Sequence, residues 1–185
     1  GMGSYLASII KQFQYAKSMA DKSFAQLSDE QLHWQPNEAS NSIAIIVKHM
    51  AGNMLSRWTD FLTSDGEKSW RNRESEFEDT FSSREEMLAY WEKGWACLFD
   101  AIEPLSKTDL ERVIYIRNQG HTVVEAINRQ LAHYSYHVGQ IVYLARLIAD
   151  QSWKSLSIPK GGSEAYNAEK FSQEKQRQHF TDDFK

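Results

Sequence analysis

The chain has 185 residues, of which 41% are hydrophobic and 25% charged, and its formal net charge is −4. These values are ordinary for a globular protein, and the length suits one domain with a substantial core. No cluster of lysine and arginine stands out along the sequence, so we expect no nucleic acid partner. The longest apolar runs, such as residues 43–47, are far too short to span a bilayer, so we expect no membrane partner.

Cysteine usage bears on the compartment. Cys97 is the only cysteine, so no intrachain disulfide can form, which fits a reducing cytoplasm. The first residues lack a basic segment followed by an apolar one, so we expect no signal peptide. The sequence therefore predicts a cytoplasmic protein. In it, Cys97 is expected to be a small core or flanking residue rather than a nucleophile.

Four long segments carry apolar residues at helical spacing. They span about residues 4–27, 42–62, 83–103 and 122–149. Ser42 (or Asn41 before it) can cap the second segment, and Pro104 ends the third. Ser83 and Thr122 each open a capping-box pattern. Because there is little strand signal, the sequence predicts an all-α fold, a four-helix bundle over about residues 4–150.

Three other segments lack this spacing. Residues 63–81 are polar and highly charged, which predicts a long loop that is either a functional lid or a solvated connection. A β-branched run at 113–116, followed by a polar turn, predicts a short extended or hairpin element before the last helix. Residues 151–185 are polar, so we expect an irregular extension, or a short helix packed on the bundle, within a single domain 1–185.

The most informative motif lies on the last helix, where His133 and His137 are four residues apart. Such a pair lies one turn apart on the same helix face, so both rings can supply a nitrogen to one metal ion. His49 flanks the apolar stripe of the second helix, which can neighbour the fourth in a bundle. Three histidines would leave one position open for water or substrate. The alternative is that all three are only core or surface residues.

Polar residues near these histidines are candidates for supporting roles. Asn53 and Arg57 follow His49 by four and eight residues, along the same helix face. Arg57 could hold a carboxylate of a substrate, or it could form an ordinary ion pair. Gln140 could hydrogen-bond to a metal-ligating residue and orient it without touching the metal, or it could fill a buried polar gap.

Two glycines lie close to the histidines in sequence. Gly52 follows His49, and Gly139 follows His137, which suggests that small residues make room there for a neighbouring helix or a ligand. No general base is evident near the histidines, and no nucleophile motif appears in the chain. Three imidazoles suit zinc, nickel, iron and copper alike, so the sequence does not select the metal.

Four stretches of the sequence together match the pattern of a known family. They are His49-Met50-Ala51-Gly52-Asn53, His133-Tyr134-Ser135-Tyr136-His137-Val138-Gly139-Gln140-Ile141, the early segment 27–36 and the late segment 157–161. On these residues the chain resembles the DinB/YfiT-like superfamily of metal-dependent proteins, and within it an uncharacterised subgroup. The likeness extends over nearly the whole chain, and the stretch on the last helix is its most specific part.

The resemblance implies a four-helix bundle, often a homodimer. It also implies a divalent metal, commonly nickel or zinc, with iron as a further option, held by histidines that fall here on His49, His133 and His137. Some members of the superfamily are thiol-dependent S-transferases or isomerases that use bacillithiol, mycothiol or glutathione. The implied partner is therefore a small-molecule substrate together with a low-molecular-weight thiol.

Two hypotheses of function follow. In the first, the protein is a metal-dependent enzyme, a thiol S-transferase or a hydrolase, that uses the open metal position to activate a thiol or water. In the second, it is a non-catalytic metal-binding or stress-response protein that keeps the ion without using that position. A pocket that reaches the histidines favours the first hypothesis, and a site blocked by side chains favours the second.

Overall fold

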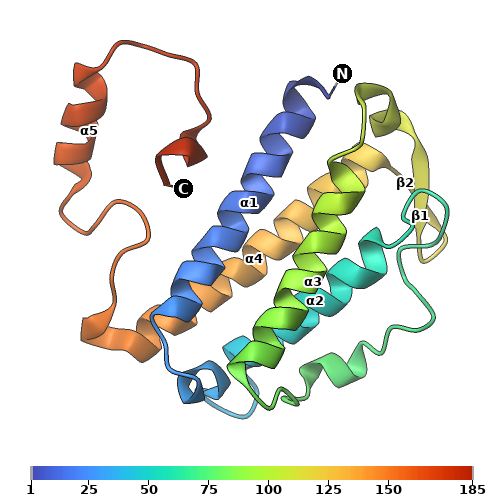
Figure 1. Ribbon diagram of the computed structural model, residues 1–185, viewed down its shortest axis with the longest axis horizontal. Coiled ribbons are helices and arrows are strands. Elements are labelled where there is room, and N and C mark those ends of the chain that lie inside the picture. The colour runs from blue at the N-terminus through green and yellow to red at the C-terminus, as the bar shows by residue number, and fades with distance from the viewer. Residues whose placement is uncertain (1, 185) are drawn as a thin grey trace.

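The computed structural model describes residues 2–184 and is mainly helical (Figure 1). Its four long helices are α1 (Gly3–Ala25), α2 (Ile43–Trp58), α3 (Arg84–Ile102) and α4 (Val123–Ala149). A two-stranded antiparallel hairpin, β1 (Val113–Ile116) and β2 (Gln119–Thr122), directly precedes α4, and a shorter helix α5 (Ser163–Ser172) follows it. The all-α class and the hairpin before the last long helix are thus confirmed.

Local hydrogen bonds explain where the helices begin. The hydroxyl of Ser42 accepts a hydrogen bond from the backbone N–H of Ile45, and Thr122 forms a complete capping box with Glu125. These caps satisfy N–H groups that have no partner inside the helix. At α3 the box is only half formed, because the carboxylate of Glu86 accepts from Ser82, one residue before the cap.

The four long helices enclose one apolar core. Helix α2 packs against α3 and α4, and α1 packs against α4. The largest fully buried side chains include Phe13, Trp91, Trp95 and Tyr134. Of the 16 residues of α2, 14 are buried, so its polar residues lie inside the protein together with its apolar ones. Buried polar groups are tolerated when they are hydrogen-bonded, which makes α2 the place to look for function.

The glycines in the helices serve different purposes. A Cβ atom on Gly94 would lie 2.9 Å from the Cα of Ala51, so this glycine permits the close approach of α3 to α2. A Cβ atom on Gly139 would meet nothing within 4 Å. The close approach of a neighbouring helix, one of the two reasons expected for Gly139, is therefore wrong, because its face of α4 is open.

The segment after α2 is bound to the hairpin. Arg117 and Asn118 form its two-residue turn with φ angles of 52° and 63°, the left-handed conformation that such a turn requires. Their backbone N–H groups donate to the carboxylate of Asp65 at 2.8 and 2.9 Å. The N–H of Gly66 donates to the carbonyl of Tyr115 at 2.8 Å. These bonds fix the hairpin tip beside the end of α2.

The loop predicted over residues 63–81 is irregular except for a 3₁₀ turn at Glu74–Phe77, which packs on α2. In the C-terminal extension, no residue of α5 is buried. The chain instead returns to α1 at Phe180–Phe184, where Phe180 contacts the ring of Tyr15 and Asp182 pairs with Lys11 at 3.2 Å. Among the residues described, no helix is long and apolar enough to cross a membrane.

The two helix glycines provide a matched test of packing. We expect Gly94→Ala to lower the free energy of unfolding by about 1–3 kcal/mol, because the added methyl group forces α2 and α3 apart. Gly139→Ala should instead raise it by up to about 1 kcal/mol, since alanine favours a helix and the site is open. Urea denaturation followed by tryptophan fluorescence measures both. Equal effects of the two substitutions would contradict this account of the α2–α3 contact.

Candidate metal centre

Three histidines from two helices come together in the structure. His49 projects from α2, and His133 and His137 project from α4, with one candidate ligand atom from each lying within 4.8 Å of the others. The ring centroids are 4.6 Å apart for the pair on α4, and His49 is 5.5 Å from His133 and 4.9 Å from His137. His49 is buried and the other two are half-buried. This cluster could hold a metal ion.

The nitrogen partners of the rings fit such an ion. Nδ1 of His49 lies 3.0 Å from a carboxylate oxygen of Glu76, and Nδ1 of His137 lies 2.9 Å from the amide oxygen of Gln140. In both rings this leaves Nε2 for a metal. Nε2 of His133 is buried and has no hydrogen-bond partner in the part of the chain described. Metal-ligating histidines commonly show this pattern, in which the second nitrogen is held by a carboxylate or amide.

Burial also places two of the rings in the form that binds metals. It lowers the pKa of His133 to about 4, with further lowering from the neighbouring histidines His137 and His49. Burial lowers the pKa of His137 as well, despite the opposing effect of the hydrogen bond that its ring donates to the amide oxygen of Gln140. Both imidazoles are therefore neutral at pH 7, and a neutral imidazole needs to lose no proton before it ligates.

Glu76 is a residue that sequence reasoning missed. It lies in the 3₁₀ turn of the loop, and Arg71 binds both of its carboxylate oxygens, at 2.8 and 2.9 Å. Burial raises the pKa of Glu76, but the hydrogen bonds from His49 and Arg71 outweigh burial and hold the pKa below its usual value. Sequence reasoning found no acidic group near the histidines, and in the structure an ionised carboxylate contacts one of them.

Gly52 makes this contact possible. A Cβ atom on Gly52 would lie 2.3 Å from a carboxylate oxygen of Glu76. The glycine thus makes room beside the histidines, as its position suggested, but for a carboxylate from the loop rather than for a helix or a ligand. The sequence contained a signal, a charged loop and a helix glycine one turn after His49, yet nothing in it joined the two.

A buried hydrogen-bond chain lies next to the cluster and ties α2 to α4. The indole N–H of Trp58 donates to the hydroxyl of Tyr134 at 3.2 Å, and this hydroxyl donates to the amide oxygen of Asn53 at 2.7 Å. Burial raises the pKa of Tyr134, so the phenol keeps its proton. These hydrogen bonds fix the spacing of the two helices that carry the histidines.

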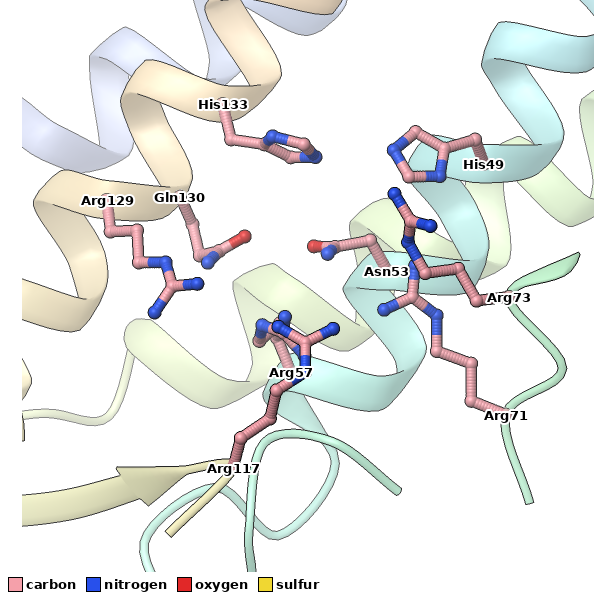
Figure 2. Close-up of a pocket in the computed structure, with 9 residues that line it drawn as sticks. All are labelled: His49, Asn53, Arg57, Arg71, Arg73, Arg117, Arg129, Gln130 and His133. Atoms are coloured by element: carbon pink, nitrogen blue, oxygen red, sulfur yellow. The ribbon is translucent and has the colours of Figure 1, made fainter. Parts of the chain in front are cut away.

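A cavity of about 390 Å³ opens beside the histidines (Figure 2). It is lined by His49, Asn53, Arg57, Arg71, Arg73, Arg117, Arg129, Gln130 and His133. Asn53 and Arg57 were singled out from the sequence, whereas the other four arginines and Gln130 were not. Gln140 does not line the cavity, because it lies behind His137. The other three histidines of the sequence, His33, His121 and His179, lie outside the cluster.

The structure thus defines an all-α protein with a three-histidine cluster that could hold a metal ion between two helices, and a polar cavity beside it. The chain belongs to the family described as "Protein of unknown function (DUF1572)", whose model matches residues 2–162. This match spans all three histidines. The description does not name DinB, and it does not conflict with that resemblance. No curated protein and no solved structure matches the chain.

The Glu76 contact can be tested without a metal. Glu76→Ala leaves the guanidinium of Arg71 buried beside an empty space, and removing one partner of a buried pair costs about 3 kcal/mol or more. We expect a loss of this size in the free energy of unfolding, measured by urea denaturation, together with faster tryptic cleavage after Arg71 and Arg73. Glu74→Ala, in the same turn but exposed, is the control and should change stability by less than about 0.5 kcal/mol. Matching behaviour of the two variants would show that Glu76 does not hold the loop.

Proposed function

We propose that the protein is a metal-dependent enzyme of the DinB type, in which the four long helices form a bundle and His49, His133 and His137 hold one divalent transition metal. Nickel and zinc are the first choices for this ion, and iron is the third. The observation that carries the proposal is the three-histidine cluster with a cavity at its edge. Three protein ligands leave a position open, as catalytic sites require.

The proposed reaction is thiol transfer. A divalent ion held by three imidazoles lowers the pKa of a thiol or a water molecule in the open position. We therefore propose a low-molecular-weight thiol as one substrate and an electrophilic small molecule as the other, with hydrolysis as the related alternative. Glu76 and Gln140 hold the rings of His49 and His137 in place, while Asn53 and Arg57 contact the substrate in the cavity.

The cavity also bears on the choice between an enzyme and a non-catalytic metal-binding or stress-response protein. His49 and His133 both line it, so a small molecule in the cavity would touch two of the proposed ligands. A protein that only stores or senses an ion has no need of a cavity at the open side of its metal. This access supports the enzyme over the non-catalytic alternative.

Metal content is the direct test. Elemental analysis by mass spectrometry of wild-type protein loaded with nickel or zinc should show near one equivalent of metal. His133→Ala should lose it, and Glu76→Gln should weaken binding by about 10–100-fold, because the second nitrogen of His49 loses its carboxylate partner. His121→Ala, on the hairpin, is the matched control and should keep the full metal content.

Two results would contradict the proposal at different levels. A wild-type protein that takes up no metal, even with added nickel or zinc, would leave the histidines as structural residues. A metal-loaded protein that binds no thiol and turns over neither thiol nor ester substrates would contradict the enzyme hypothesis. It would leave the hypothesis of a non-catalytic metal-binding protein.

We also propose that the protein is a homodimer, supported by exposed apolar side chains on one face of α4. Tyr136, Tyr143 and Leu147 are 64%, 70% and 51% exposed, and exposed apolar patches mark interaction surfaces. Light scattering should give the mass of two 21.4 kDa chains for the wild type and one chain for Tyr143→Glu/Leu147→Glu. Tyr115→Glu, an exposed tyrosine on the hairpin, should remain dimeric. A wild-type mass of one chain would overturn the proposal.

A further inference from the structure

The cavity beside the histidines is strongly cationic. Five of its nine lining residues are arginines, and no carboxylate is among the nine. The arginines come from α2, the loop, the hairpin and α4, and they are Arg57, Arg71, Arg73, Arg117 and Arg129. Figure 2 shows the guanidinium groups of Arg57, Arg117 and Arg129 gathered at the side of the cavity away from the histidines.

Nearby carboxylates neutralise only part of this charge. Glu76 is bound by Arg71. Glu67 contacts Arg71 at 3.3 Å and Arg117 at 2.5 Å, and lies 3.9 Å from Arg57. Five guanidinium groups against these two carboxylates leave an excess of three positive charges. Asp65 does not reduce the excess, because Lys68 lies beside it and offsets its charge.

Three of the arginines keep donors for a ligand. Arg57 is 6% exposed, its Nη1 donates to the carbonyl of Gly66, and its Nε is buried without a partner. Arg73 lies over the ring of Phe77 and is exposed. Arg129 is exposed, and its Nη1 lies 3.3 Å from Nε2 of His121. Guanidinium groups arranged in this way suit carboxylate and phosphate oxygens, which they bind in a forked geometry.

A second buried group in the cavity is also without a partner. The side-chain oxygen of Gln130 is buried and accepts no hydrogen bond within residues 2–184, and the residue is 3% exposed. Figure 2 shows its amide pointing into the cavity toward Asn53. An unsatisfied buried acceptor is costly, so it needs a donor from elsewhere. A hydroxyl or N–H group of a bound molecule in the cavity would supply one.

We propose that this cavity binds a small molecule with at least two anionic groups, carboxylates or phosphates, and a hydroxyl or N–H group. The anionic end lies against Arg57, Arg117 and Arg129, and the donor group contacts Gln130. The other end of the molecule faces His49 and His133. A volume of about 390 Å³ is in the range of cavities that hold small metabolites. The inference rests on the proposed function only in making this molecule the substrate, since the cationic cavity exists without a metal.

Calorimetric titration of the 185-residue chain tests the binding. The probes are succinate and inorganic phosphate, with succinamide as the neutral control, at low ionic strength. We expect at least one anion to bind with a dissociation constant near or below about 1 mM, and more weakly as salt is added, because exposed charges are screened. Stronger binding of succinate would assign the anionic groups as carboxylates, and stronger binding of phosphate would assign them as phosphates.

Charge-removing variants locate the site. Arg117→Gln/Arg129→Gln should weaken anion binding at least tenfold, while Arg112→Gln/Arg177→Gln, which removes the same charge from exposed positions outside the cavity, should leave it unchanged. Arg129→Gln alone changes one exposed side chain of α4, so its effect on binding is separable from any effect on folding. Wild-type protein that binds neither anion, or equal losses in the two double variants, would overturn the proposal.

Metal content measured on the same samples separates this inference from the proposed function. Both double variants should keep the metal content of the wild type, because neither changes a histidine or Glu76. Anion binding by a protein that takes up no metal would uphold the cationic site and refute the metal centre. Full metal content without anion binding would uphold the metal centre and refute the cationic site.

Discussion

The buried carboxylate of Glu76 is the contact on which the arrangement of the site depends. It joins Arg71 of the loop to His49 of α2, and it fits only because position 52 is a glycine. Charges buried at this depth are stable only when paired and hydrogen-bonded, so the loop has one low-energy place to lie. The same loop holds the hairpin tip through Asp65 and Gly66. The loop thus contacts two segments that are separate in sequence, α2 through Glu76 and the hairpin through Asp65 and Gly66.

Helices and loops contribute different residues to this site. All three histidines project from long helices whose spacing is fixed by the core and by the hydrogen-bond chain through Tyr134. Three of the five cavity arginines, at positions 71, 73 and 117, project from the loop and the hairpin turn. Rigid helices suit side chains whose nitrogen atoms must be placed to within a few tenths of an ångström. Loops suit side chains that contact a larger, variable molecule.

The sequence was informative wherever a periodic pattern carried the signal. Apolar spacing located the four long helices, side-chain oxygens located their caps, and the His133–His137 spacing indicated one face of α4. The prediction of α2 extended to residue 62, four residues too far, because Phe61 and Leu62 continue the apolar pattern after the helix ends at Trp58. Gly139 misled in the opposite way, because proximity in sequence says nothing about which side of a helix is crowded.

What the sequence did not reveal depends on contacts between distant segments. The cavity arginines are spread from position 57 to position 129, so no basic cluster is visible along the chain although one forms in space. Glu76 is 27 residues from His49, within a run of charged residues that all look alike until the chain folds. Such groupings follow from tertiary packing, and only the folded structure brings them together.

Because the histidines and most of the cavity arginines stand on different kinds of segment, the two can diverge separately during evolution. A change at the hairpin tip alters the wall facing the ligand, and it leaves the helices that carry the histidines untouched. Proteins of this family can therefore keep the three-histidine cluster while the shape and charge of the cavity beside it change. Residues 73 and 117 are the positions at which such relatives should differ first, whereas Arg71 is needed to pair with Glu76.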